Sequence, residues 1–566
     1  MKKTSILLSF LLLFIGCREK EPEDFNTRLQ NLNEKIRTVE SAIEKAEGRT
    51  LQAGKIDLEI ARFFAEYLSW EMEHPDIMKD VLVRDRFKGK RNLTPLQKEQ
   101  RYLDHLDREL SGSDYILDQA MARLKKKDVG PLPASIDWSK VEYKDNNFRY
   151  NGRIVFPAGF NIINWCLVDR EKHPEWTDQD EEKAQRRLFK MKDIGGGLTG
   201  VGIHPLECIT PSGDVDMDKI DEKINEIRKY EKEGFDVFVG LRFGANEMLE
   251  KKWPGISNAS GNGVGVDIDH PAIPGLIRKV LAKLVPALEK NTTVQSFDMA
   301  NEPFFQLDAW SGHSIKAYRK WLEERHGSIK ELNRLWRTDY RNFSEIPYPK
   351  DKPGKECSAG EWYDRISFHN YRVTSFFSII YSEIHRYMPD AAVHMKGQDN
   401  NSLGPKTLSI TDGINREMLG SCVDLHGLDT RPLPITEPRM AMLEAEMPVM
   451  NYDDSLYGFH WLGQSFLYDF LTTLQPHHPL IDLEYHAFSI NPIRVPDIGT
   501  GHAEATLWLA HLHGLIGNVV WYWHSRYGPD AFPEDYLKIW LYGSISTQPI
   551  VAAEYFSYDD GSEYLL

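Results

Sequence analysis

The stretch Val294-Gln295-Ser296-Phe297-Asp298-Met299-Ala300-Asn301-Glu302-Pro303 predicts a buried strand that ends in a carboxylate. Apolar residues cluster over the length of a strand, and Pro303 lacks the N–H that further ladder pairing would need. The stretch Pro479-Leu480-Ile481-Asp482-Leu483-Glu484-Tyr485-His486 has the same design. A single glutamate at a strand end is usually only solvated. Two at matching positions indicate the pair of carboxyl groups that hydrolysis of a sugar acetal requires, with one protonating the leaving oxygen and the other attacking or activating water.

Strand-like and helix-like patterns alternate on both sides of this stretch, which predicts an α/β fold with a parallel sheet. Eight strands are expected at 156–161, 198–203, 235–241, 294–302, 391–395, 422–428, 480–484 and 518–523. Eight strand–helix units fit a (β/α)₈ TIM barrel, whose active sites lie at the carboxyl ends of the strands. Glu302 and Glu484 would then end strands four and seven, across the barrel from one another.

The chain is expected to have four regions. They are a signal segment at 1–17, a polar tether and helical region at 18–130, the barrel at 131–556 and a C-terminal tail at 557–566. The helical region contains two further helices, expected at 95–110 and 114–126. Its first helix has an apolar seam at three- and four-residue spacing, formed by Leu29, Leu32, Ile36, Val39 and Ile43. The seam predicts packing on another helix, in a spacer or in an oligomerisation module, so a homo-oligomer is one reading.

The first 17 residues carry a targeting pattern. Lys2 and Lys3 precede a short apolar run at 6–15, which is too short to span a bilayer, and Gly16-Cys17 follows. Residues 13–17 resemble a bacterial lipobox, which would make Cys17 the lipidated first residue of the mature protein. An ordinary cleaved secretory signal is the alternative. Either reading predicts export to the cell envelope, and the first predicts membrane contact through a lipid anchor.

The composition narrows the class of ligand. The formal net charge of -16 argues against nucleic acid, because phosphate binding needs a basic surface. Fourteen Trp and 24 Tyr can stack on sugar rings, although most such residues fill cores. The cysteines after Cys17 have no CxxC spacing, so no zinc cluster is expected, and the mechanism implies no cofactor.

The pattern resembles clan A of the glycoside hydrolases, which are retaining (β/α)₈ enzymes. In that clan an Asn-Glu pair ends strand four, a nucleophilic Glu ends strand seven, and an aromatic residue of strand eight lines the sugar site. Asn301-Glu302-Pro303, Glu484 and Trp521 or Trp523 are similar in type and order. Within the clan, two segments are similar to the β-galactosidases of family 42. They are Ala317-Tyr318-Arg319-Lys320-Trp321-Leu322-Glu323-Glu324-Arg325-His326-Gly327-Ser328-Ile329-Lys330-Glu331-Leu332-Asn333-Arg334-Leu335-Trp336 and, more weakly, Cys422–Asp429.

The resemblance implies Glu302 as general acid/base and Glu484 as nucleophile in a double displacement with retention. We expect repulsion from Glu484 and partial burial to raise the pKa of Glu302. Asn301 would donate to the sugar 2-hydroxyl, or else bond local backbone. Trp523 would form a stacking platform, or else pack in the core. Further candidates for contacts with hydroxyl groups are Asn161, His204, His426 and Asp429, and Tyr485 could orient the nucleophile.

Two classes of function remain open at this point. The first is an exported retaining β-glycosidase, similar to a β-galactosidase and acting on an oligo- or polysaccharide. The second is a surface lipoprotein that binds glycans on a barrel without catalysis, which would keep aromatic residues but lose one carboxylate. Convergence of Glu302 and Glu484 in the folded chain separates them, because a gap beyond about 10 Å is too long for the chemistry.

Overall fold

The computed structural model describes residues 24–46, 48–81, 84–85, 89–90, 93–126, 140, 142–144, 147–161, 177–179, 182, 197–257, 261–290, 294–307, 310–347, 357–397, 412–430, 461–485 and 501–520. The chain divides into two compact units. The first comprises Met1–Pro133 with Tyr527–Leu537, and the second comprises Ala134–Arg526 with Lys538–Leu566. Each unit is described by itself below.

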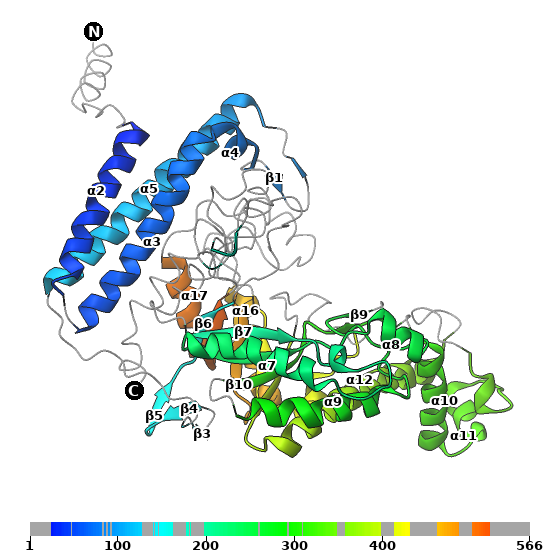
Figure 1. Ribbon diagram of the computed structural model, residues 1–566. Coiled ribbons are helices and arrows are strands. Elements are labelled where there is room, and N and C mark those ends of the chain that lie inside the picture. The colour runs from blue at the N-terminus through cyan, green and yellow to red at the C-terminus, as the bar shows by residue number, and fades with distance from the viewer. Residues whose placement is uncertain are drawn as a thin grey trace, which may run out of the picture. The chain divides into compact units, whose positions relative to one another are not determined.

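The second unit contains a closed barrel of parallel strands, which confirms the predicted fold (Figure 1). Around the barrel the strands follow in the order β10-β12-β13-β14-β15-β6-β7-β8. Their bounds are β6 Ala158–Phe160, β7 Leu198–Ile203, β8 Asp236–Leu241, β10 Val294–Asn301, β12 Ala392–Lys396, β13 His426–Leu428, β14 Leu480–Tyr485 and β15 Leu515–Val520. Since the strands are parallel and consecutive along the chain, their carboxyl ends meet at one rim.

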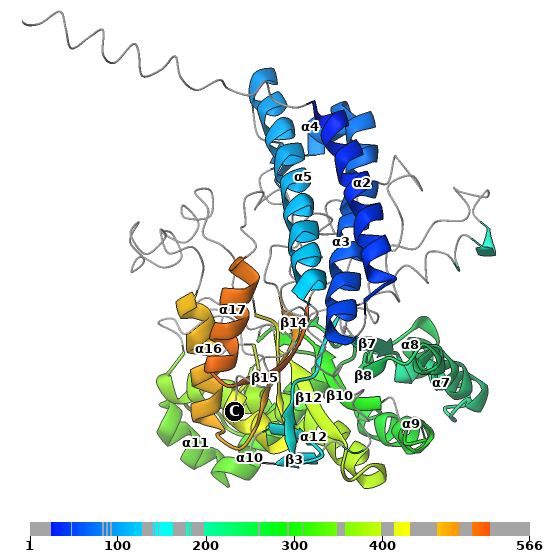
Figure 2. The same cartoon turned by 90° about the vertical axis from the view of Figure 1, so that its left-hand side faces the viewer.

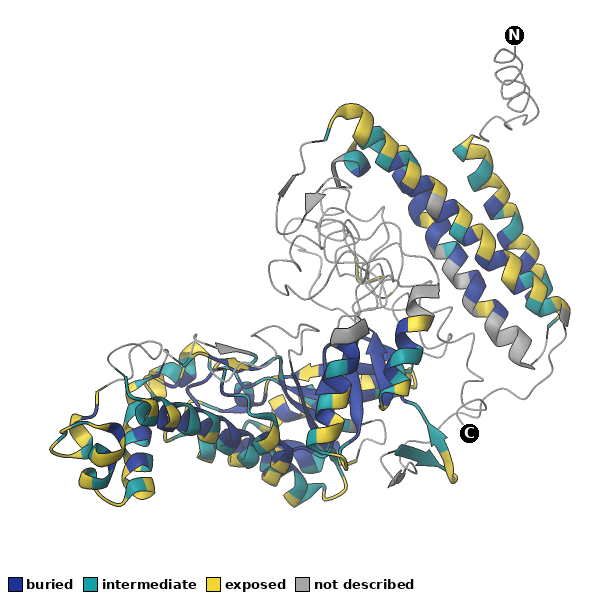
Figure 3. Ribbon diagram, turned by 180° about the vertical axis from the view of Figure 1, so that it is seen from behind, coloured by how far each residue is buried: buried dark blue, intermediate teal, exposed yellow. Residues whose placement is uncertain are grey.

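Helices cover the outer surface of the barrel strands. The longer ones are α7 Met217–Lys232, α9 Ile273–Leu288, α12 Ala359–Tyr387, α16 Trp461–Leu474 and α17 Gly501–Leu512. In Figure 2, α16 and α17 lie beside β14 and β15, where Leu471, Leu480 and Leu515 share a buried apolar cluster. Figure 3 shows the strands buried and the outward faces of the helices exposed, so the hydrophobic core lies between the sheet and its helices.

The helical excursion after β10 has a core of its own. The helices α10 Gly312–His326 and α11 Ile329–Trp336 are joined at Gly327, whose φ of 68° suits a left-handed helix end. Tyr318, Leu322 and Trp336 are buried there. Near the start of the unit, the predicted hairpin is present as β4 Asn147–Tyr150 and β5 Arg153–Val155, with positive φ at both turn residues.

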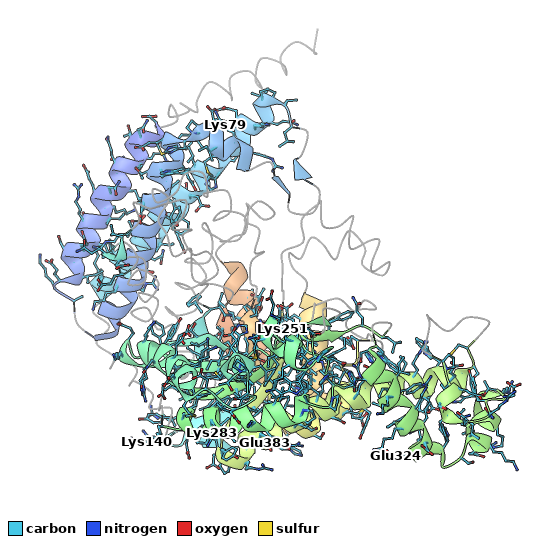
Figure 4. All side chains as sticks on the ribbon, turned by 45° about the vertical axis from the view of Figure 1, so that its right-hand side comes forward. Lys79, Lys140, Lys251, Lys283, Glu324 and Glu383 are labelled. Carbon is cyan, nitrogen blue, oxygen red and sulfur yellow. The ribbon has the colours of Figure 1, made fainter. Side chains whose placement is uncertain are left out.

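The first unit is helical, as the sequence predicts. It contains α2 Phe25–Ile43, α3 Gly48–Glu73, α4 Pro75–Val81 and α5 Pro95–Lys126. The seam residues Leu32, Ile36, Val39 and Ile43 are buried, and α2 packs on both α3 and α5 of the same chain. Lys79 of α4, labelled in Figure 4, pairs with Glu99 of α5 at 2.5 Å and lies over the Tyr102 ring.

Three expectations about element bounds are wrong. The sixth strand, expected to begin at Cys422, begins at His426, and Cys422 ends a short 3-10 helix. The helices expected at 95–110 and 114–126 form one continuous helix, α5. A glycine within a helix costs only about 1 kcal/mol, and packing on α2 and α3 offsets that cost. The eighth strand begins three residues earlier than expected, at Leu515, and residues 521–523 of the expected strand lie outside the described residues.

Candidate active site

Glu302 follows directly on β10 and is held there by its backbone. Its N–H donates to the Lys396 carbonyl at the end of β12, at 2.8 Å. Its φ of 45° lies in the left-handed region, which is uncommon for a residue with a side chain. Gly263 packs so tightly beside this turn that a Cβ there would lie 2.1 Å from the Asn301 carbonyl oxygen. Backbone strain supported by close packing is a feature of functional sites.

Glu484 lies within β14, one residue before the strand ends. The register with β15 shifts between Asp482 and Tyr485. Leu483 belongs to an apolar cluster shared with Leu198 and Phe238 of β7 and β8, whereas Tyr485 belongs to the cluster formed with α16 and α17. Irregularities of this kind re-aim side chains beside active sites. Next to this shift, the Glu484 carboxylate points toward the other carboxylates of the site.

Three carboxylates converge at this rim of the barrel. One oxygen from each of Glu302, Asp429 and Glu484 lies within 4.8 Å of the other two. Glu302 is partly exposed, whereas Glu484 and Asp429 are 6% and 0% exposed. The three residues come from the ends of the fourth, sixth and seventh strands. Glu302 and Glu484 are therefore well within the limit of about 10 Å that separates a glycosidase from a glycan-binding protein without catalysis.

Lys396, the last residue of β12, places a cation among these carboxylates. Its Nζ contacts Oε2 of Glu484, and its side chain is 5% exposed. Burial lowers the pKa of Lys396 from its ordinary value, and the nearby carboxylates of Asp429 and Glu302 oppose that lowering. The ammonium supplies the positive charge that such an acidic cluster otherwise draws from a metal ion.

A buried carboxylate below the cluster ties the neighbouring strand ends together. Asp298 of β10 accepts from the Lys396 backbone N–H at 2.9 Å and from the Arg242 guanidinium at 2.9 Å. Arg242 follows β8, so this one carboxylate links three strands. His394 of β12 lies 3.8 Å from Asp298 and bonds Ser296 Oγ. Complete burial lowers the pKa of His394 to about 4, so its ring is neutral at neutral pH.

Asp482 supports the backbone of Glu484 in a similar way. Its Oδ1 accepts from the Glu484 N–H at 3.1 Å. Its Oδ2 accepts from the hydroxyls of Thr430 and Tyr468, the latter at 3.3 Å. Burial raises the pKa of Tyr468 well above its ordinary value, which keeps that hydroxyl a donor. Asp482 is therefore engaged in holding the strand end, and Glu484 remains the carboxylate directed to the cluster.

Three of the residues predicted to bind sugar lie at the carboxyl ends of strands. Asn301 ends β10 and pairs with Lys396 in the sheet. His204 follows β7 and is exposed. Asn161 follows β6, but its side-chain amide donates to the Leu483 carbonyl at 2.8 Å. The side-chain amide of Asn161, expected to donate to a sugar hydroxyl, thus holds the backbone just before Glu484.

Two predicted residues are not brought to the cluster. His426 begins β13 instead of following it, and its ring lies 5.6 Å from that of His478, which precedes β14. Burial lowers the pKa of His426 to about 3, so the ring is neutral. Tyr485 is fully buried toward α16, where Gln464 donates to its hydroxyl at 3.3 Å. His426 lies at the start of its strand and Tyr485 packs among the helices beyond a register shift, so neither side chain is placed with the carboxylates. Trp523 and Cys17 lie outside the described residues.

Lys396 and Arg242 are the site residues that sequence reasoning missed. Each comes directly at or after the end of an apolar strand, as Glu302 and Glu484 do. The signal for Lys396 was present, since the run Ala392-Val393-His394-Met395-Lys396 is a strand that ends in a charge. What the pattern lacked was any indication that this lysine faces the carboxylates.

Comparisons with known proteins agree with the resemblance stated above. Residues 174–430 match the family model of glycoside hydrolase family 42, described as beta-galactosidase. A beta-galactosidase from Geobacillus kaustophilus is 22% identical over 209 residues, which cover 34% of this chain and 30% of that protein. The match thus spans less than a third of that relative.

Solved structures share the fold. The crystal structure of an apo exo-carrageenase of family 42 from Bacteroides ovatus has a TM-score of 0.68 at 21% identity, covering 94% of this chain and 70% of that one. The beta-galactosidase from the haloarchaeon Halorubrum lacusprofundi has a TM-score of 0.53 at 15% identity, covering 72% and 58%. With its closed barrel and its match over residues 174–430, the chain is similar to the glycoside hydrolases of family 42.

Proposed function

We propose that the protein is an exported retaining β-glycosidase, similar to a β-galactosidase in its preferred substrate. The observation that carries the proposal is the approach of Glu302 and Glu484, with oxygens within 4.8 Å at the ends of strands four and seven. Retaining enzymes hold their two carboxyl groups about 5–5.5 Å apart, whereas inverting enzymes leave about 6.5–9.5 Å for a water. The short separation supports direct attack by one carboxylate.

Glu302 suits the general acid and Glu484 the nucleophile. Glu484 is buried and contacts the Lys396 ammonium, which favours its ionised form. Glu302 is partly exposed at the rim, where a leaving group and later a water can reach it. In the first step Glu302 protonates the glycosidic oxygen while Glu484 attacks the anomeric carbon. In the second step Glu302 takes a proton from the water that releases the sugar.

The test is a panel of aryl β-glycosides, beginning with the galactoside, assayed with the purified protein and with Glu484→Ala and Glu302→Ala. We expect the wild type to release aryl alcohol and both variants to lose at least about 1,000-fold in kcat/KM. Glu383→Gln is the matched control, because Glu383 (labelled in Figure 4) is a buried carboxylate of α12 whose partners are Arg278 and Arg386. Proton NMR of the first-formed anomer reports retention or inversion.

A carrageenan is a second candidate substrate. The likeness to the Bacteroides ovatus exo-carrageenase covers 94% of the chain, whereas the likeness to the Halorubrum β-galactosidase covers 72%. The part of this chain that the likeness to the exo-carrageenase leaves uncovered is shorter than residues 1–133. That likeness therefore extends into the N-terminal helical unit. Release of reducing ends from carrageenan oligosaccharides by a wild type that is inactive on aryl galactosides would favour this candidate.

The rival class is a glycan-binding lipoprotein without catalysis. It is favoured if no aryl glycoside or polysaccharide is cleaved while the protein still binds one of them in a pull-down. The envelope location remains part of our proposal and is supported by the pattern around Cys17. Among the helices in the described part of the chain, none is both long and apolar enough to cross a bilayer.

A further inference from the structure

A buried lysine lies among the carboxylates of the cluster, and the proposed function uses it only through its contact with Glu484. Lys396 is 4% exposed, and its Nζ contacts the Glu484 carboxylate. A buried charge that is not paired costs several kcal/mol, so its surroundings decide what it does. Among the described residues, the charged and titratable groups around it include Glu484, Asp429, Glu302, Asp298, Arg242 and, on its own strand, His394.

The charges of these groups can be balanced in pairs. Asp298 is matched by Arg242, which donates to it at 2.9 Å. Burial keeps His394 neutral by lowering its pKa to about 4. The double displacement needs one proton and one negative charge shared by Glu302 and Glu484. Asp429 adds a further buried negative charge within 4.8 Å of both, and the lysine is the group that balances it.

We propose that Lys396 is a positioning residue that serves as the counter-ion of Glu484, with Asp429 as its second partner. The proposal rests on the proposed function, because it assigns the lysine to the nucleophile of that reaction. Lys396 ends β12 and Asp429 follows β13, so they approach Glu484 from neighbouring strands of the same rim. The ammonium holds the Glu484 carboxylate ionised and fixes its direction before a substrate arrives.

The second partner matters because the negative charge moves during the reaction. In the first step the bond from the anomeric carbon to the leaving oxygen breaks, and a bond from that carbon to a Glu484 oxygen forms. The proton of Glu302 passes to the leaving oxygen. Glu484 is then a neutral ester and Glu302 an anion, so the charge has moved without any change in the total.

Lys396 faces the charge in both positions. Glu302 and Asp429 each favour the charged form of the lysine, so the ammonium keeps carboxylate partners after Glu484 has been esterified. In the second step the water oxygen bonds to the anomeric carbon, the water proton goes to Glu302, and the ester bond breaks. The negative charge then returns to Glu484 and to the ammonium that contacts it.

The first experiment needs no catalytic activity. The melting temperatures of wild type and Lys396→Met are compared at about pH 5 and about pH 8. Without the ammonium, the folded carboxylates bind protons more tightly than those of the unfolded chain, so stability is lost as pH rises. We therefore expect the deficit of the variant to be clearly larger at the higher pH. Val393→Ala, a core truncation in the same strand, should show a deficit independent of pH.

The second experiment follows the pH dependence of kcat/KM on the best aryl glycoside. An opposite charge close by shifts a carboxyl pKa by about 1–3 units, so the acid limb of Lys396→Met should move to higher pH by about that much. Lys396→Arg keeps the charge and should keep the acid limb near that of the wild type. Lys396→Met with Asp429→Asn removes both charges and should move the limb back toward the wild type.

The outcomes separate this proposal from the proposed function. A pH-independent stability deficit of Lys396→Met, together with an unmoved acid limb, would show that the lysine only fills space and would overturn the counter-ion role. If the wild type cleaves no glycoside, the proposed function fails, and the pH dependence of the stability deficit alone decides whether Lys396 is the counter-ion. If Lys396→Met does not fold, Lys396→Met with Asp429→Asn replaces it in the melting comparison. The double variant still leaves Glu484 without its cation, so a deficit that does not grow with pH would overturn the counter-ion role.

Discussion

The position of Glu302 depends on a residue that is distant in sequence and carries no side chain. Gly263 has a φ of 73°, and a Cβ there would meet the Asn301 carbonyl and the Cα of Pro303. A side chain at this position would push the turn that carries Glu302 away from Glu484. The general acid is thus placed both by its own strand and by the close approach of the segment that follows β9 (Gly261–Asn262).

Gly263→Ala should therefore impair catalysis, and the strain of a side chain at a φ of 73° should also lower stability. The added methyl group would displace the Asn301–Pro303 backbone, and a misplacement of about 1 Å in an active site can cost on the order of 100-fold in rate. We expect a loss of about that size in kcat/KM on the best aryl glycoside. Gly202→Ala is the control, because a Cβ there meets no atom within 4 Å. Equal activity of the two variants would contradict the packing argument.

At the scale of elements, the helical unit contains a buried charge with a pH dependence of its own. Asp57 of α3 is 0% exposed, and the Arg123 guanidinium of α5 donates to it at 2.9 Å. Burial raises the pKa of Asp57 to about 7, although the Arg123 charge opposes the rise. The ordinary value in an unfolded chain is about 3.9.

The sign of the effect follows from these two values. Between about pH 4 and pH 7 the folded unit holds a proton on Asp57 that the unfolded chain has lost, so stability falls as pH rises through this window. Asp57→Asn has no such proton. We expect the melting temperature of the wild type, measured by the helical circular dichroism signal, to fall relative to that of Asp57→Asn as pH rises through the window. Asp104→Asn, at an exposed position of α5, should show no comparable trend.

The apolar seam of α2 also belongs to the scale of elements. Its residues are buried against α3 and α5 of the same chain, so the seam does not by itself require a second copy. The sequence pattern could indicate a partner helix but could not say whether that helix comes from the same chain. A homo-oligomer therefore stays a prediction that rests on no particular surface.

At the scale of the whole molecule, we propose that Cys17 anchors the protein to a membrane. Cys17→Ser, expressed in a bacterial host that processes lipoproteins, should move the protein from the membrane pellet to the soluble fraction. It should also abolish incorporation of labelled palmitate. Retention of the label by Cys17→Ser would sink the lipobox interpretation. Loss of the signal sequence with no label in the wild type would indicate an ordinary secretory signal.

The sequence alone determined the barrel and the two carboxylates at its rim. Apolar runs of strand length, ended by Pro303 or by charged residues, set the strands, and helical periodicity set the layers between them. The positions of Glu302 and Glu484 followed because each comes at or near the end of such a run. These features depend on local patterns, which a chain displays before it folds.

The tertiary structure decided which side chains meet. Lys396 of β12 reaches Glu484 of β14 across β13, and Asp298 of β10 reaches Arg242, which follows the neighbouring strand β8. At the register shift in β14, Tyr485 packs among the helices. The left-handed backbone of Glu302 is supported by Gly263 and by the Lys396 carbonyl. Periodicity carries no information about such irregularities, because they arise from packing between segments far apart in sequence.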